Sequence, residues 1–412
     1  MSKGRREQYA RLLVEVGLNL QQGQPLVISC PVDCAPFARL CAEAAYDAGA
    51  SRVELDWQDD ALTRLRYLRA DDAVFDVCPP WRRSLRVDNV RAGAAFLSIH
   101  AEDPAALSGV DAGRIRRANR AAGEALREFR EATRQNRVQW CVAAIPVPAW
   151  ARTVFPELPE EAAMARLWER IFEAVHVEQD GDAVGAWREH IARLTRHRDW
   201  LNGLRLRALR YRNALGTDLT VELPEGHFWA AGEERTPAGV PFVPNMPTEE
   251  VFTAPRRDGV NGRAVASMPL VLDGNLVRGF ALTLERGRIV RVEAEEGEAV
   301  LRNAAAVDEG ASYLGEVALV PFDSAISRTR TLFYNTLFDE NASCHLAFGS
   351  AYPCIVGGEH MSEAERLERG LNVSMTHVDF MIGTPDLSIT GIRQDGSEIP
   401  VFVDGNFALP RS

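Results

Sequence analysis

Short apolar runs alternate with amphipathic stretches along the first 150 residues of the chain. Apolar residues recur at helical spacing over residues 9–20, whereas the next apolar run, 25–29, has the length of a buried strand. The alternation continues, and we predict helices at 35–48 and 113–133 and strands at 52–56, 94–99 and 138–145. Strands that alternate with helices in this way are typical of a parallel sheet with helices on its faces.

The pattern changes near residue 200, after a helical stretch at 159–202. Residues 204–301 carry short apolar runs separated by Gly, Pro and Asn. We predict strands at 219–223, 265–272, 277–284 and 289–292, with a hairpin turn within 284–289. The sequence therefore predicts an α/β N-terminal domain with a parallel sheet and a helical extension at residues 1–200. An α+β domain with a mostly antiparallel sheet is predicted to follow at residues 201–412.

The charge and the cysteines limit the partners and the compartment. The formal net charge is −11, so nucleic acids and anionic membranes would be repelled, and we expect neither as a partner. No run approaches the roughly 20 apolar residues of a membrane span, and the N-terminus lacks the apolar core of a signal peptide. The seven cysteines form no C-x-x-C pair, which favours free thiols and a cytoplasmic protein.

Several kinds of catalytic chemistry are excluded by what the sequence lacks. Lys3 is the only lysine, so a Schiff base, a lysine general base and a P-loop lysine are not expected. The chain contains no G-x-S-x-G, H-E-x-x-H, G-x-x-x-x-G-K-[ST] or G-x-G-x-x-G motif. Nucleotide binding and serine-hydrolase chemistry therefore find no support, and carboxylates and histidines remain as candidates.

The segment 372–383 has the pattern of a strand that displays a histidine and a carboxylate together. Residues two apart share one face of a strand, so His377 and Asp379 would project together beside Met375 and Met381. The opposite face would be apolar and part of the core, with Val378, Phe380 and Ile382. An imidazole next to a carboxylate on a rigid strand suits a divalent metal ion, although an exposed His–Asp pair on an edge strand would give the same pattern.

A second carboxylate stands in the apolar segment 312–321, which also has the pattern of a strand. Alternation places Glu316 on the same face as Leu314, Ala318 and Val320. A carboxylate among such neighbours is costly to bury unless it is paired or bound to a metal. Either an arginine partner or a metal ion would satisfy it.

Two further segments supply candidates that the local pattern does not decide. Glu249 and Glu250 are adjacent, so on an extended chain they point in opposite directions and one at most would enter a given site. His345 lies among small and apolar residues and is followed by Tyr352; a lone histidine in that setting is more often a core residue than a ligand. Taken together, however, two histidines and three carboxylates on short apolar strands fit a site for two metal ions.

These segments resemble the thermophilic metalloaminopeptidases of the aminopeptidase T and aminopeptidase S type. The similar motifs are Thr248-Glu-Glu-Val-Phe-Thr-Ala-Pro255, Leu314-Gly-Glu-Val-Ala-Leu319, Phe338-Asp-Glu-Asn-Ala-Ser-Cys-His345 and Thr376-His-Val-Asp379, and the resemblance extends over essentially the whole chain. It implies that Glu250 and Glu316 are carboxylate ligands, that His345 serves one metal ion, and that His377 and Asp379 serve the other. It also implies a tyrosine near the metals at Tyr352 and a homodimer that encloses the active sites.

The hypothesis that follows is an aminopeptidase with two divalent metal ions per subunit, of Zn, Co, Mn or Mg, that removes amino-terminal residues from peptides. The ions would activate a water molecule and polarise the scissile carbonyl, and one could hold the free α-amine. Glu316 is the first candidate to carry the water proton and Glu340 the second, while Tyr352 could bind the oxyanion. Two alternatives stay open: a dinuclear hydrolase of another amide, ester or phosphoester, and a peptide-binding protein without activity.

Overall fold

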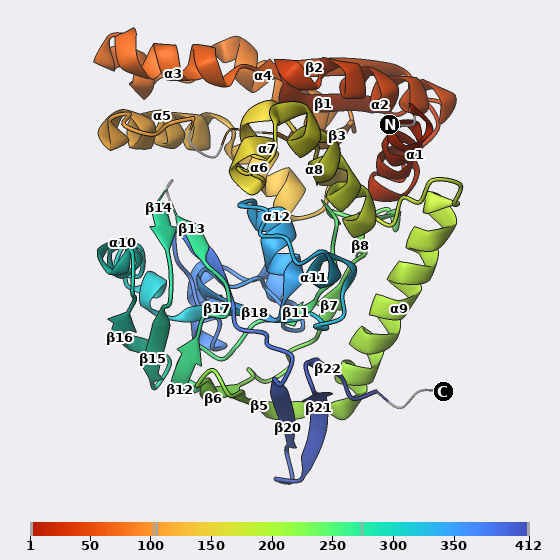
Figure 1. Cartoon of the computed structure of the whole chain (residues 1–412). Helices are drawn as coiled ribbons and strands as arrows, with labels where there is room; N and C mark the ends of the chain where they lie inside the picture. The colour runs from red at the N-terminus through yellow and green to blue at the C-terminus, as the bar shows by residue number, and fades with distance from the viewer. Residues whose placement is uncertain (1–2, 102, 104–105, 273–274, 410–412) are drawn as a thin grey trace. The chain divides into compact units, whose positions relative to one another are not determined.

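The computed structural model describes residues 3–101, 103, 106–272 and 275–409 (Figure 1). These residues form two compact units, each made of two stretches of chain: Met1–Glu189 with Glu233–Pro247, and His190–Gly232 with Thr248–Ser412. The chain passes from the first unit to the second inside one long helix, α9 (Ala183–Leu204). None of the helices in these described ranges has the length and apolar character that a membrane crossing needs.

The first unit is built around a parallel sheet with the strand order β10-β4-β3-β1-β2. Its strands are β1 (Pro25–Pro31), β2 (Arg52–Gln58), β3 (Ala95–His100), β4 (Trp140–Ala144) and β10 (Asn245–Met246). A short hairpin of β8 (Glu234–Arg235) and β9 (Pro241–Phe242) precedes β10. Because β10 pairs with β4, the segment 233–247 belongs to this unit although it lies beyond residue 200.

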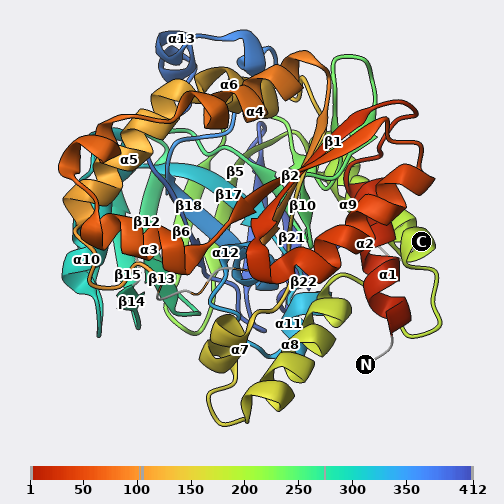
Figure 2. The ribbon, with the colours of Figure 1, turned by 90° about the horizontal axis from the view of Figure 1, so that it is seen from above.

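Helices cover both faces of this parallel sheet. The helices of the first unit are α1 (Lys3–Leu12), α2 (Ala35–Asp47), α3 (Asp60–Arg69), α4 (Pro80–Arg91), α5 (Ala112–Ala125), α6 (Arg127–Arg134), α7 (Pro148–Val154) and α8 (Glu160–Ala174). Figure 2 shows α1 and α2 on one side of β1 and α4 and α6 on the other. The predicted single helix at 113–133 is wrong, since the backbone leaves the helical region at Leu126. The break allows Phe129 and Ala132 of α6 to pack against Phe96 of the sheet.

In its described residues, the second unit contains two large antiparallel sheets and a separate two-stranded one. The larger has the order β16-β15-β12-β6-β5-β20-β21-β22, and the smaller has the order β19-β18-β17-β11-β7. The larger sheet comprises β5 (Leu206–Arg212), β6 (Asp218–Glu222), β12 (Val260–Val265), β15 (Ala281–Glu285), β16 (Arg288–Glu293), β20 (Ser388–Arg393), β21 (Glu398–Val403) and β22 (Asn406–Phe407). The smaller comprises β7 (Ala230–Ala231), β11 (Val251–Thr253), β17 (Leu314–Leu319), β18 (His345–Gly349) and β19 (His377–Met381).

One hydrophobic core joins these two sheets of the second unit. The smaller sheet contributes Val317, Leu346 and Phe380 to it, and the larger contributes residues such as Leu209 and Leu282. Burial of this apolar surface is the main stabilising force of the unit, and it uses only one face of the smaller sheet. The other face is therefore available for polar side chains. Short helices complete the unit: α10 (Glu298–Ala304), α11 (Ala325–Thr329), α12 (Thr336–Asp339) and α13 (Glu363–Glu368).

The predicted fold class is confirmed, with differences in individual strands. The hairpin at 284–289 is present, and its turn has positive φ at Arg286 (48°) and Gly287 (81°), as a two-residue hairpin requires. The predicted strand 265–272 is wrong: β12 ends at Val265, and after Pro269, which has no N–H to donate, the chain pairs as β13 (Leu270–Leu272) with β14 (Asn275–Val277). The predicted strand 277–284 is likewise split between β14 and β15.

Candidate metal centre

All the predicted ligands lie in or next to neighbouring strands of the smaller sheet. Glu250 immediately precedes β11, Glu316 lies in β17, His345 begins β18, and His377 and Asp379 lie in β19. The strands are adjacent in the order β19-β18-β17-β11, so residues that are more than 120 positions apart in the chain meet on one surface. Antiparallel pairing of these strands is what assembles the site.

The pairing register places small residues between the polar ones. Cross-strand partners share a face of the sheet, and Ala347 is the partner of Glu316 on one side and of Asp379 on the other. In the same way Ala318 is the partner of His345. Because these alanines have no side chain beyond Cβ, the carboxylate and imidazole groups can converge above them.

A β-bulge brings Glu316 to this face. Leu314 pairs with Phe348 while Glu316 pairs with Ala347, so two steps along β17 match one step along β18. Leu314 therefore joins the core with Phe348, and Glu316 points to the opposite side. The prediction that Leu314 and Glu316 share a face is wrong for this reason. Gly315 is the extra residue, and a Cβ there would lie 2.4 Å from the carbonyl oxygen of Ser350.

The ligand atoms form two groups that have Glu316 in common. One group is Glu250, Glu316 and His345, and the other is Glu316, His377 and Asp379. His345 Nε2 lies 3.2 Å from Glu250 Oε2 and 3.6 Å from Glu316 Oε1. His377 Nε2 lies 3.4 Å from Glu316 Oε2 and 3.2 Å from Asp379 Oδ1. The two carboxylate oxygens of Glu316 thus face different histidines.

Both histidines are oriented by the backbone. His345 Nδ1 lies 3.2 Å from the carbonyl oxygen of Ser343, and His377 Nδ1 lies 2.8 Å from that of Ser350. A carbonyl oxygen can only accept, so Nδ1 carries the proton in each ring and donates it. This leaves Nε2 directed at the carboxylates, which is the usual arrangement of metal-binding histidines.

The pKa values reflect a buried cluster with excess negative charge. Burial raises the pKa of Glu250, and repulsion from Glu316 and Asp379 adds to this effect. Burial also opposes ionisation of Glu316, but its hydrogen bonds with His345 and His377 outweigh this and lower its pKa to about 2. The imidazole pKa values are raised because attraction to the carboxylates exceeds the effect of burial.

Divalent cations suit this donor set. Three carboxylates and two imidazoles offer only oxygen and nitrogen atoms, converging in two groups whose members lie within 4.8 Å of one another. Leaving several carboxylates buried together without a cation is costly, and a shared carboxylate is typical of paired metal ions. The residues present would therefore fit two ions, with Glu316 available to both groups.

Comparison with known proteins agrees with this chemistry. Residues 3–407 match the family described as thermophilic metalloprotease M29. The chain belongs to the M29 metalloprotease family. It is 47% identical to aminopeptidase AmpS of Bacillus subtilis over 97% of this chain and 98% of that protein, and 43% identical to aminopeptidase T of Thermus thermophilus over 98% of each.

Solved structures extend the comparison to the fold. Wild-type AmpT from Thermus thermophilus superposes with a TM-score of 0.92 and 42% identity, covering 99% of this chain and 100% of that one. A 2,5-dihydroxypyridine dioxygenase from Pseudomonas putida KT2440 gives a TM-score of 0.58 at 12% identity, covering 100% and 99%. At that identity only the fold is shared, and the M29 assignment depends on the closer relatives.

Two further predicted residues of this M29 metalloprotease lie beside these two groups of candidate ligands (the metal groups). The Tyr352 ring packs edge-on against His377, with centroids 5.6 Å apart. Burial raises the pKa of its hydroxyl, and the nearby carboxylates, Glu316 foremost, raise it further. Glu340 belongs to neither group, yet burial and repulsion from Asp379 and Glu250 raise its carboxyl pKa well above the usual range.

The neighbours Glu249 and Glu250 separate as their alternation along the chain predicts. Glu250 enters the cluster, whereas Glu249 Oε1 accepts a hydrogen bond from the backbone N–H of Ala325. The backbone N–H of Glu249 donates to Asn341 Oδ1 at 2.8 Å, and Asn341 is fully buried. Asn341 thereby holds the backbone next to Glu250 against the segment that carries Glu340. This role of Asn341 was not predicted from the sequence, although Asn341 lies inside one of the four motifs.

A second buried amide and a carboxylate hold the segments next to the strands that carry the candidate ligands. Asn372 Nδ2 donates to the carbonyl oxygens of Gly310 (2.8 Å) and Gly349 (2.6 Å). Asp308 accepts hydrogen bonds from the backbone N–H groups of Ala311 and Met375, each at 2.7 Å. Partial burial opposes ionisation of Asp308, but the hydrogen bonds outweigh it and lower its pKa.

Replacing Asp308 with asparagine should destabilise the fold at neutral pH by about 1–2 kcal/mol, the low end for bonds to a charged acceptor because the carboxylate is partly exposed. The folded-state pKa is lowered, so the stabilisation is present above the unfolded pKa of about 3.9 and is lost as the pH falls through the folded value. Urea unfolding of both proteins at pH 7 and pH 3 measures this. A variant equally destabilised at both values would contradict the argument.

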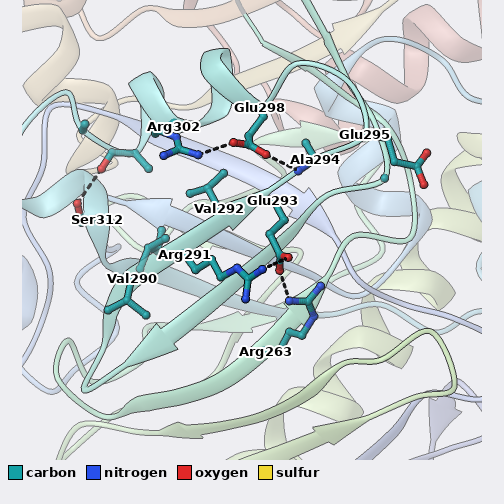
Figure 3. Close-up of a pocket in the computed structure, with 14 residues that line it drawn as sticks. Arg263, Val290, Arg291, Val292, Glu293, Ala294, Glu295, Glu298, Arg302 and Ser312 are labelled. Carbon is teal, nitrogen blue, oxygen red and sulfur yellow. Dashed lines mark hydrogen bonds and ion pairs between the residues drawn. The ribbon is translucent and has the colours of Figure 1, made fainter.

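The second unit also has an open hollow of about 800 Å³ beside β16 and α10. Five of its charged side chains pair with one another: Arg263 and Arg291 with Glu293, and Arg302 with Glu298 (Figure 3). The lining shares no residue with either metal group. This hollow is therefore not where the ligand chemistry lies.

Proposed function

We propose that the protein is an aminopeptidase that uses two divalent metal ions to hydrolyse the amino-terminal peptide bond of its substrates. The observation that carries the proposal is the division of the ligands into two groups that share Glu316. The names of the relatives at 40–47% identity, all aminopeptidases, support the choice of reaction. Glu250 with His345 would hold one ion, and His377 with Asp379 the other.

Ions at these two groups would supply Lewis acidity towards a water molecule and the scissile carbonyl, and a ligand position for the free α-amine. The protein's own residues would do the rest. Glu316 was the first candidate for proton transfer, but both of its oxygens face histidines, so we assign that role to Glu340. Glu340 is outside both groups, so its carboxylate can take the proton of the attacking water and return it to the leaving amine. The Tyr352 hydroxyl would donate a hydrogen bond to the oxyanion.

We further propose a homodimer in the cytoplasm, with peptides that have a free amino terminus as substrates. The seven free cysteines fit a reducing compartment. Light scattering during gel filtration tests the dimer, since a dimer would have twice the 45.5 kDa mass of one chain.

Removal of the metal ions should abolish activity reversibly. After dialysis against a chelator, the protein is expected to be inactive on leucine p-nitroanilide, and addition of Zn, Co, Mn or Mg should restore turnover. Emission spectrometry would measure the metal content of the same samples. Activity that survives complete metal removal would overturn the mechanism, and cleavage of phosphoesters without cleavage of aminoacyl anilides would overturn the substrate class.

A further inference from the structure

An aromatic pair lies at the border of the metal groups. The rings of Phe252 and Tyr352 have centroids 5.6 Å apart and are tilted by 58°. Tyr352 in turn contacts the ring of His377. The pair therefore links a residue near Glu250 to a ligand of the other group.

Phe252 lies on the same face of the sheet as the metal groups. It follows Glu250 by two residues, and β11 places it opposite Ala318 of β17 and Ala230 of β7. Ala318 is itself the partner of His345, so only an alanine separates Phe252 from that histidine across the sheet. Adjacent strands lie about 4.8 Å apart, so the backbones of Phe252 and His345 are separated by roughly two strand spacings.

The far side of Phe252 is supported by a small apolar cluster. Phe252 packs with Ala230 against five buried residues, namely Ala254, Ala351, Cys354, Ile355 and Leu371. This support keeps the ring from turning away from the site. Phe252 nevertheless remains partly exposed, and half of the surface of Tyr352 is accessible (50%). A partly exposed aromatic surface beside polar ligands is the usual composition of a binding pocket wall.

We propose that Phe252, together with the ring of Tyr352, binds the side chain of the substrate's amino-terminal residue and makes the enzyme prefer medium and large apolar residues. This inference rests on the proposed aminopeptidase function. Once the α-amine and the scissile carbonyl are held at the metal groups, the first side chain must lie within a few ångströms of them. The wall formed by Phe252 is apolar, so it stabilises leucine or phenylalanine by removing their surface from water and gives alanine or glycine less.

The test compares kcat/KM for the leucyl, phenylalanyl, alanyl and glutamyl p-nitroanilides. The wild type should favour leucyl over alanyl by about 10- to 100-fold. Phe252→Ala should lower kcat/KM for the leucyl substrate about 10-fold or more and for the alanyl substrate less than about 2-fold. Phe252→Leu should retain most of the preference. Phe322→Ala is the matched control, because Phe322 is a partly exposed phenylalanine (39%) of the same unit outside the site, and it should change neither value.

Binding without turnover gives a second measurement. Calorimetry should show weaker binding of free L-leucine, but not of L-alanine, to metal-loaded Phe252→Ala, with the metal content unchanged. An equal loss for all four anilides, or an unchanged leucyl-to-alanyl ratio in both Phe252 variants, would overturn the inference while leaving the aminopeptidase function intact. A wild type that cleaves none of the anilides would instead overturn the proposed function.

Discussion

Replacing Glu316 with glutamine is expected to remove both metal ions and to lower kcat by about 1,000-fold or more. Glu316 directs one carboxylate oxygen at His345 and the other at His377, so in the variant one group loses its oxygen and the other keeps only a neutral one. An amide keeps one neutral oxygen and presents an NH2 group in place of the other, which binds no cation. Metal content by emission spectrometry and turnover of leucine p-nitroanilide measure the two effects.

Variants of residues that belong to a single group serve as comparisons. Glu250→Gln and Asp379→Asn should each reduce the content by one ion rather than two, since each residue is a member of one group. Glu309→Gln should change nothing, because Glu309 is exposed and paired with Arg257. The fold of Glu316→Gln should be retained, because glutamine has nearly the same size and shape as glutamate and its amide can still form hydrogen bonds. Two ions retained in Glu316→Gln would rule out its shared role.

The His377–Asp379 pair was predictable because its geometry is local. A two-residue period on a strand is enough to place both side chains on one face, and Val378, Phe380 and Ile382 on the other face are buried as predicted. The limit of the strand was not predictable. β19 begins only at His377, and Met375, predicted to lie beside the pair, is 81% exposed and donates its backbone N–H to Asp308. A hydrogen bond to a residue 67 positions earlier leaves no mark on the local pattern.

The side of the sheet on which Glu316 lies was not predictable from the sequence, for a different reason. Alternation placed it with Leu314, and the bulge at Gly315 separates the two, sending Leu314 to the core and Glu316 to the metal groups. The bulge is a property of the pairing between β17 and β18, which are separated by the helices α11 and α12 in the chain. Gly315 next to Glu316 is visible in the sequence, but whether it forms a bulge depends on how β17 pairs with β18.

Glu250 and His345 could not be assigned from spacing at all. Their approach to 3.2 Å depends on the register of β11, β17 and β18, which joins residues 95 positions apart. Only the resemblance to the metalloaminopeptidases singled them out. The same register places Ala318 and Ala347 between the polar side chains on one face of the sheet. His345 therefore lies beside carboxylates, although its neighbours in the sequence are apolar.

Replacing Glu340 with glutamine is expected to lower kcat by about 100- to 10,000-fold while both metal ions stay bound. Glu340 lies close enough to Asp379, Glu250 and His345 to be influenced by their charges, but it is a member of neither ligand group. Glutamine has nearly the same shape and cannot accept and return a proton, so the loss should be in turnover, with KM changed less than about 2-fold. Steady-state kinetics on leucine p-nitroanilide, with metal analysis of the same protein, measures this.

Metal content and turnover together distinguish Glu316 from Glu340, the two candidates for the proton carrier. Glu316→Gln should lose metal and turnover together, whereas Glu340→Gln should lose turnover alone. Glu359→Gln, a change at an exposed carboxylate in the same unit, should leave both unchanged. If Glu340→Gln lost metal in proportion to turnover, Glu340 would be a ligand. If it kept full turnover, another group would have to carry the proton. Glu316, whose two oxygens both face histidines, would then have to act as a metal ligand and as the proton carrier.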